Sequence, residues 1–275
     1  PRVPCRGGQC RGSYDEQSSG SPLPFDLASL LPAGIEPLVA AAIIGLSMLT
    51  SALTATFGLG GGALMITVLV LVFPPAVAVP VHGLVQLGSN GGRAVMMRRD
   101  VQWRFAGWFI AGGVPGAFLG AGVATLLPEQ LLTCAIAAFV LWSAWSPQPK
   151  PEVRGRVQTA IAGFVAAIIG MVTGVGGPLV ATMLRFLPDR RQIIATHAVV
   201  MTAQNALKAV AFAAFGFVFA SYVPLVIAMV LSGLVGTAIG GRLLANLPEK
   251  SFRLGFKLAL SAIALSLLWT SVFPA

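Results

Sequence analysis

The stretch FGLGGG at residues 57–62 returns later in the chain as TGVGGP at residues 173–178. Each stretch follows an apolar run and places several glycines where a membrane-spanning helix would otherwise continue. Glycine disfavours the helix interior, so both stretches predict a break between two helical segments. These two breaks decide the architecture, because the sequence around them also repeats.

Two further segments recur in the same order. The segment HGLVQLGSNGGR at residues 82–93 returns as HAVVMTAQNALK at residues 197–208. A pair of glycines at 116 and 120, followed by Leu-Pro-Glu at 127–129, returns as glycines 236 and 240, followed by Leu-Pro-Glu at 247–249. Three matches in the same order predict that the chain consists of two copies of one helical repeat.

Composition places these helices in a membrane. Of the 275 residues, 56% are hydrophobic and 10% are charged, with a mean hydropathy of +0.84, whereas a soluble domain carries about 25% charged residues. Continuous apolar runs such as Leu38–Ala55, Phe105–Leu127 and Tyr222–Leu244 approach or exceed the length of about 20 residues that a spanning helix needs. Continuous rather than alternating runs exclude a barrel. We therefore expect an all-α polytopic protein of the plasma (inner) membrane.

The pattern predicts two transmembrane repeats, residues 36–145 and 157–275, joined by a cytoplasmic linker at 146–156 and preceded by a polar, disordered tail at 1–35. Each repeat should contain a helix, a glycine break, a short helix and three longer helices. The expected helices are about 36–57, 63–73, 76–98, 102–126 and 129–145 in the first repeat, and about 157–172, 178–187, 191–215, 221–246 and 249–272 in the second.

Basic residues suggest how the repeats are oriented. Cytoplasmic loops of membrane proteins are enriched in Lys and Arg, which here cluster at 98–104, 150–156, 185–191 and 242–253. The connections at 73–76, 127–130 and 216–222 carry none. With the tail outside, each glycine break becomes a hairpin that enters and leaves on one side, and the two repeats are inverted. Inverted repeats with broken helices are a recurrent plan of secondary transporters.

The net charge of +9 has a topological explanation, because the cations lie mainly in short loops. No nucleic-acid-binding motif is present, and the three cysteines form no metal-type cluster. We therefore expect no nucleic-acid partner, no cofactor and no metal, with the lipid bilayer as the surroundings.

The glycine breaks are the first candidate for ligand binding. Inside a membrane, the backbone groups that they expose must be satisfied by protein, water or ligand. A helix that begins at a break would direct N–H donors toward an anion. Close helix packing is the alternative reason for small residues. The candidate residues here are Gly58, Gly60, Gly61, Gly62, Thr173, Gly174, Gly176 and Gly177.

A polar stripe on the third long segment of each repeat is the second candidate. His82, Gln86, Asn90 and Arg93 share one helical face in the first repeat, and His197, Gln204, Asn205 and Lys208 follow the same face in the second. Met201 takes the position of Gln86. Polar residues in spanning helices normally face protein or a water-filled cavity. The cations fit either anion attraction or snorkelling to the interface, and the histidines fit either helix packing or proton coupling.

Carboxylates are missing from the predicted membrane interior. Asp100, Glu129, Asp189 and Glu249 all fall at predicted helix ends. Proton pumps and cation exchangers usually place a carboxylate in the membrane, so its absence beside amides and cations favours an anionic or neutral substrate. No catalytic motif is present either, so an enzyme is not expected.

The paired glycine breaks and the paired His-to-Arg/Lys segments resemble the TauE/SafE family of sulfite and organosulfur anion exporters. The resemblance covers about residues 36–273. It implies a permease that moves small anions, such as sulfite or sulfonates, by alternating access. An anion channel and a non-transporting scaffold remain open alternatives. A proton and sodium are the two candidate coupling ions.

Overall fold

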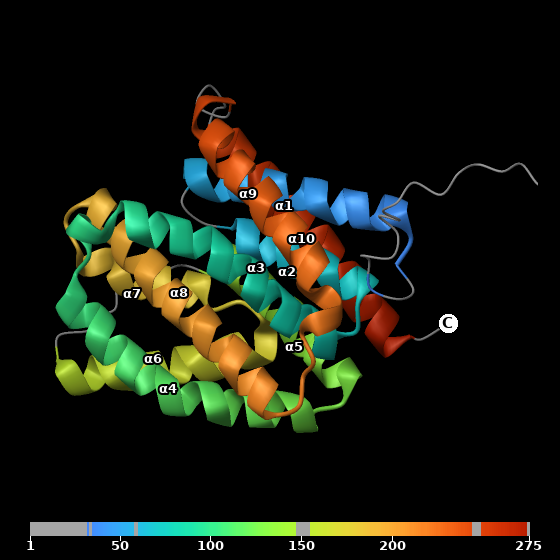
Figure 1. Cartoon of the computed structure of the whole chain (residues 1–275), viewed down its shortest axis with the longest axis horizontal. Coiled ribbons are helices and arrows are strands. Elements are labelled where there is room, and N and C mark those ends of the chain that lie inside the picture. Colours follow the sequence, from blue (N-terminus) through green and yellow to red (C-terminus); the bar gives the residue numbers. More distant parts are fainter. Residues whose placement is uncertain (1–31, 33–34, 58–59, 147–154, 244–248, 274–275) are drawn as a thin grey trace, which may run out of the picture.

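The computed structural model describes residues 32, 35–57, 60–146, 155–243 and 249–273, and these residues form an all-helical structure (Figure 1). The predicted tail at 1–35 and the linker at 146–156 lie almost entirely outside the described residues. The expected all-α polytopic class is confirmed.

The observed helices follow the predicted plan closely. The first repeat contains α1 (Pro37–Phe57), α2 (Gly61–Val72), α3 (Pro75–Met96), the short 3-10 helix η2 (Arg98–Asp100), α4 (Trp103–Leu126) and α5 (Glu129–Trp145). The second contains α6 (Arg156–Thr173), α7 (Gly177–Met183), η3 (Leu184–Phe186), α8 (Arg190–Ala214), η4 (Ala220–Tyr222), α9 (Val223–Leu243) and α10 (Glu249–Val272).

The short segment after the second break differs from the prediction. A helix was expected over 178–187, but α7 ends at Met183 and continues only as a 3-10 turn. Pro188 ends the 3-10 turn, because a proline disfavours helical geometry in the residue before it, and Leu187 is extended. Asp189 then starts α8 as its N-cap, and its carboxylate accepts a hydrogen bond from the Arg191 N–H at 3.0 Å.

Five of the described helical segments are long and apolar enough to cross a membrane: Pro37–Thr56, Trp103–Leu126, Arg156–Thr173, Ala220–Ile239 and Leu254–Ser271. The central helices α3 and α8 are longer than several of these, with 22 and 25 residues, but they carry the polar stripes. Helix α2 has 12 residues, about 18 Å at 1.5 Å per residue, which is too short to cross about 30 Å of hydrocarbon.

Helices from different repeats pair with each other. In Figure 1, α4 lies beside α6 and α1 beside α9, and α3 packs on α8 and α5 on α10. Under the sequence repeat, α1 corresponds to α6 and α4 to α9, so the α1–α9 and α4–α6 pairs are equivalent. The two repeats therefore exchange partners. The orientation of each repeat in the membrane, and hence the inversion, stays a prediction.

Glycines allow α4 and α6 to approach very closely. A Cβ atom added to Gly112 or Gly116 of α4 would meet backbone atoms of Ala160 or Phe164 in α6, and one added to Gly163 of α6 would meet the Phe109 carbonyl. This is the close packing that small residues provide in membranes, where the hydrophobic effect does not drive helices together.

The α1–α9 pair adds hydrogen bonds to the same kind of contact. The Ser47 hydroxyl donates to the Met229 carbonyl at 2.7 Å, and the Ser232 hydroxyl donates to the Ile44 carbonyl at 2.8 Å. A Cβ atom on Gly236 would meet the backbone at Met48. Two hydroxyls that donate in opposite directions therefore fix the register of this pair.

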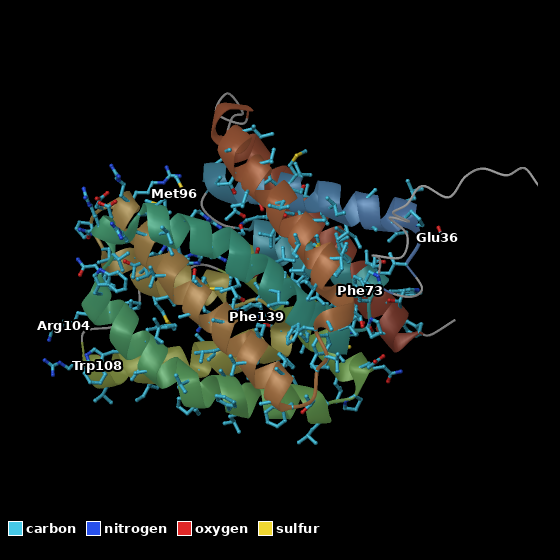
Figure 2. All side chains as sticks on the ribbon, in the orientation of Figure 1. Glu36, Phe73, Met96, Arg104, Trp108 and Phe139 are labelled. Atoms are coloured by element: carbon cyan, nitrogen blue, oxygen red, sulfur yellow. The ribbon has the colours of Figure 1, made fainter. Side chains whose placement is uncertain are left out.

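The outer surface of the bundle is apolar. Leu119, Trp142 and Trp269 are each at least half exposed, with exposed fractions of 51%, 51% and 66%. At one end of α4, Arg104 and Trp108 project outward (Figure 2), and the Arg156 guanidinium lies 5.8 Å from the centre of the Trp108 ring. Such aromatic and cationic residues are typical of the membrane interface.

Candidate substrate-binding cavity

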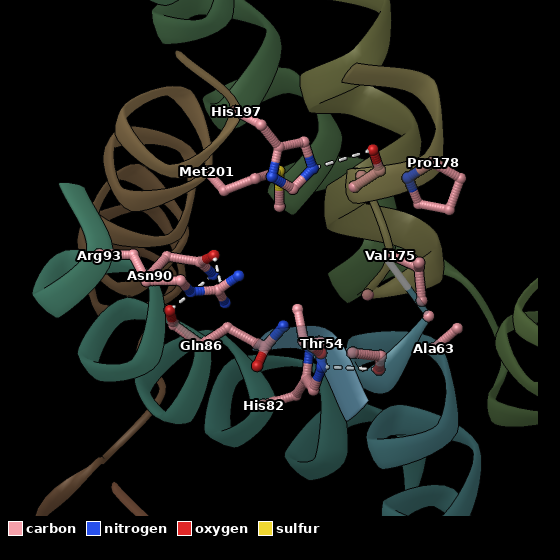
Figure 3. A pocket seen from close by; sticks show the side chains of 15 residues that line it. Thr54, Ala63, His82, Gln86, Asn90, Arg93, Val175, Pro178, His197 and Met201 are labelled. Carbon is pink, nitrogen blue, oxygen red and sulfur yellow. Dashed lines mark hydrogen bonds between the residues drawn. The ribbon is translucent and has the colours of Figure 1, made fainter. Parts of the chain in front are cut away.

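A small cavity lies where the two glycine breaks meet the polar helices (Figure 3). Its free volume is about 40 Å³, room for roughly three water molecules when one occupies about 10–15 Å³. It is lined by Thr54, Gly60, Gly62, Ala63, His82, Gln86, Asn90, Arg93, Gly174, Val175, Gly176, Gly177, Pro178, His197 and Met201. Among these lining residues Arg93 is the single charged one.

The first break gives α2 an N-terminus that opens on the cavity. Gly60 caps the helix with φ +105°, a conformation that L side chains rarely adopt. Gly62 and Ala63, in the first turn, line the cavity, and N–H groups in the first turn of a helix have no intrahelical partner. Gly61 has a different role, because a Cβ atom there would meet the Thr50 carbonyl of α1. Close packing therefore explains Gly61.

The second break is stabilised by hydrogen bonds of the Thr173 side chain. Gly174 ends α6 in the left-handed region with φ +75°. The Thr173 hydroxyl donates to the Ile169 carbonyl at 2.7 Å and accepts from the Val175 N–H at 3.3 Å. Thr173 is buried and does not line the cavity. Its position indicates that it shapes the break.

Each histidine ties a polar helix to a break. His82 Nε2 lies 3.0 Å from the Gly62 carbonyl oxygen, and His197 Nε2 lies 3.2 Å from the Gly177 carbonyl oxygen. A carbonyl oxygen only accepts, so Nε2 carries the hydrogen in both rings. These bonds make Gly62 the structural equivalent of Gly177. The sequence motifs instead align Gly61 with Gly177, one residue away.

On α3 the polar stripe is connected and faces the cavity. The Asn90 amide donates to the Gln86 carbonyl at 2.8 Å, and its oxygen accepts from an Arg93 terminal nitrogen at 3.1 Å. Figure 3 shows the Asn90 and Arg93 side chains together beside Gln86. The amide thus holds the guanidinium in place within a helix that faces the centre of the protein.

On α8 most of the equivalent stripe is enclosed, and His197 is the member that lines the cavity. Lys208 is 3% exposed, and its ammonium donates to the Gly174 carbonyl at 3.1 Å. Its alkyl chain lies against Gly83 of α3. Gln204 and Asn205 are buried, and their amide nitrogens have no hydrogen-bond partner among the described residues. The stripe on α3 therefore faces the cavity, whereas most of the stripe on α8 is packed inside the protein, although the two sequences match.

The structure brings most of the predicted candidates to one place. Ten of them line the cavity, namely Gly60, Gly62, His82, Gln86, Asn90, Arg93, Gly174, Gly176, Gly177 and His197. Gly61, Thr173, Gln204, Asn205 and Lys208 do not line it, and Gly58 lies outside the described residues. Ligand contact by any of these residues stays a prediction.

Several lining residues were not among the candidates: Thr54, Ala63, Val175, Pro178 and Met201. Ala63, Val175 and Pro178 flank or interrupt the glycine stretches, so their position next to a break could have predicted that they line the cavity. Thr54 lies on the last turns of α1 and reaches the cavity only because α1 and α2 fold back on each other at Gly61.

We expect Thr173→Val to destabilise the protein, because the isosteric side chain leaves the buried Val175 N–H without its acceptor. The expected cost is about 1–3 kcal/mol, measured as a lower Tm of the purified protein in detergent. Thr133→Val is the matched control, because the exposed Thr133 hydroxyl bonds only to the Glu129 carbonyl of its own helix. Equal Tm values for both variants would contradict a structural role of Thr173.

Comparison with known proteins gives a consistent assignment. Residues 43–267 match the family model described as "Sulfite exporter TauE/SafE". A "Probable membrane transporter protein" of Xylella fastidiosa strain Temecula1 is 32% identical over 113 residues, which cover 36% of this chain and 43% of the relative. Its counterpart in strain 9a5c is 30% identical over 113 residues with the same coverage.

The matched stretch thus spans less than half the length of each of these relatives. No solved structure matches the chain significantly. The family model, by contrast, covers most of the chain, including both glycine breaks and both polar helices. With its five membrane-span candidates, the chain is a multi-pass membrane protein that belongs to the TauE/SafE family.

Proposed function

We propose that the protein transports small anions across the membrane and binds them in the cavity between the glycine breaks. The observation that carries this proposal is the charge of the cavity. Arg93 lines it, and no acidic residue is among the described lining residues. An ion pair between Arg191 and Asp100, at 3.3 Å, lies at the start of α8, away from the cavity lining. A bound anion would therefore supply the negative charge that is missing from the surroundings of Arg93.

The neutral groups around Arg93 suit an oxyanion. The first turn of α2 offers backbone N–H donors, and the partial positive charge of the helix N-terminus adds to the guanidinium. Gln86 supplies a side-chain amide from α3. A free volume of about 40 Å³ corresponds to roughly three waters, which fits an anion with few non-hydrogen atoms.

Sulfite and small sulfonates meet these requirements, and the name of the family supports sulfite as the first candidate. Alternating access is supported by the two breaks. Each is tied by a histidine to a long helix, and helices of one repeat pair with those of the other. Because each histidine bond lies within one repeat, movement of one repeat against the other would shift one break relative to the other around the bound anion.

Uptake of hydrogen sulfite and of methanesulfonate into proteoliposomes tests this proposal, with protein-free liposomes as the baseline. We expect saturable uptake by the wild type. Failure of the folded, inserted protein to move either anion above the baseline would overturn anion transport.

Asn90→Asp sharpens the test. The near-isosteric carboxylate would pair with Arg93 and repel an anion, so we expect the apparent affinity to fall about thirtyfold, corresponding to about 2 kcal/mol. Gln130→Glu makes the same chemical change at an exposed position at the start of α5 and should leave uptake unchanged. Equal uptake by the two variants would place the anion elsewhere in the protein.

A further inference from the structure

The two histidines make the same backbone bond but differ in their second nitrogen. The Nδ1 atom of His82 is fully enclosed and has no hydrogen-bond partner in the described part of the chain. The His197 ring lines the cavity, and no hydrogen bond occupies its Nδ1 atom. Figure 3 shows this nitrogen on the side of the ring away from the Gly177 carbonyl, toward Met201. His197 is therefore the histidine that can offer a ring nitrogen to a ligand.

The backbone bond fixes what this nitrogen can do. Because Nε2 donates its hydrogen to the Gly177 carbonyl at 3.2 Å, Nδ1 of the neutral ring carries a lone pair and acts as an acceptor. An anion oxygen facing that lone pair would meet two acceptors with no hydrogen between them. The contact becomes favourable only when a proton lies between the two atoms.

The charged groups around His197 leave this proton without an internal source. Arg93 of α3 faces it across the cavity, and His82 of α3 lines the same cavity with its Nδ1 atom enclosed. Helix α7 contributes no titratable residue. Lys208, on α8 itself, donates to the Gly174 carbonyl. The other charged residues on elements packed against α8 lie near helix ends: Arg98, Arg99, Asp100, Arg104 and Arg185. No carboxylate that could exchange a proton lies among the described cavity residues.

We propose that His197 makes the site bind each anion together with one proton, shared between Nδ1 and an anion oxygen. This inference rests on the proposed anion transport and adds its coupling. The proton arrives on the imidazole from bulk water and is additional to any hydrogen that the anion itself carries. On the opposite side it leaves with the anion, and the ring returns to its neutral form, so one proton crosses with each anion.

The charge carried per anion tests the proposal in wild-type proteoliposomes. A monovalent anion that moves alone changes its accumulation about tenfold under a potential of about 60 mV, by conversion from about 2.3 kcal/mol per charge per 100 mV. An anion that moves with a proton is electroneutral. We expect uptake to be insensitive to a valinomycin-imposed potassium potential, driven by an inward proton gradient, and matched by acidification of the lumen.

Two probe anions identify the proton that crosses. Methanesulfonate carries no hydroxyl hydrogen, so its uptake with a proton would place the proton on His197. Hydrogen sulfite that moves with only its own hydroxyl hydrogen still carries a charge of −1, so potential-driven uptake of hydrogen sulfite would show that His197 adds no proton. Potential-driven uptake without acidification, for every anion that is transported, would overturn the coupling while leaving anion transport intact. No uptake of either anion would instead overturn the proposed function.

His197→Gln separates coupling from structure. The glutamine amide can still donate to the Gly177 carbonyl and offer an oxygen, but it cannot take up a proton. We expect methanesulfonate uptake by this variant to become potential-dependent, about tenfold per 60 mV, with acidification lost. His82→Gln is the matched variant, and whatever its rate, each anion should still enter with a proton. Retained electroneutral uptake of methanesulfonate in His197→Gln would exclude His197 as the proton site.

Discussion

Arg93→Gln is expected to lower the apparent affinity for anions by about a hundredfold. The guanidinium is the single charged group among the described lining residues of the cavity, and removing a charge-assisted contact from a site of this kind costs about 3 kcal/mol. Glutamine can still reach the Asn90 amide, so the local helix packing should persist. The measurement is the concentration dependence of anion uptake in proteoliposomes.

Arg93→Lys and Arg104→Gln complete this experiment. Lysine keeps the charge but loses the planar donor arrangement of the guanidinium, so we expect an intermediate loss of affinity. Arg104 is exposed at the start of α4, and its replacement by glutamine should leave uptake unchanged. Wild-type affinity in Arg93→Gln would contradict a direct role of this residue in binding.

Gly116→Leu is expected to prevent assembly of the folded protein. A Cβ atom at this position already meets the Phe164 backbone of α6, and a backbone contact cannot be relieved by a change of rotamer. The α4–α6 pair would have to separate, at a cost of more than about 3 kcal/mol. The measurement is the yield of monodisperse protein by size-exclusion chromatography in detergent.

Gly107→Leu is the matched control on the same helix. Gly107 is exposed, and a Cβ atom there meets nothing within 4 Å. Both substitutions add the same apolar side chain to α4 and remove the same helix-disfavouring glycine. A monodisperse Gly116→Leu protein with the wild-type Tm would show that α4 and α6 do not need this close contact.

Internal repetition made most of the helical plan predictable. The glycine breaks, the polar stripes and the apolar runs each have a local sequence signal, and the helices begin and end close to the predicted positions. Pairing between repeats has no such signal. Gly116 and Gly236 indicate that two helices approach closely, but only the structure shows that their partners are α6 and α1 of the opposite repeat.

The candidate site was predictable as a set of residue types but not as a geometry. His197 and Lys208 share a helical face in the sequence, yet His197 lines the cavity and Lys208 is enclosed against Gly83 and Gly174. Packing of α3 on α8 decides this difference, and packing depends on residues far apart in the chain. The repeat spacing changes by one residue between the glycine stretches and the polar segments, and the histidine bonds show that Gly62, not Gly61, is the structural equivalent of Gly177.

Exchange of partners between the repeats also has a consequence for synthesis in the cell. The Ser47 hydroxyl donates to a carbonyl that lies 182 residues later in the chain. At a translation rate of roughly 5–20 residues per second, that carbonyl is synthesised about 10–35 s after Ser47. During that interval α1 lies in the bilayer without α9, and α4 gains α6 well before α1 gains its own partner. The nascent first repeat therefore lacks packing partners for its helices until the helices of the second repeat have been synthesised.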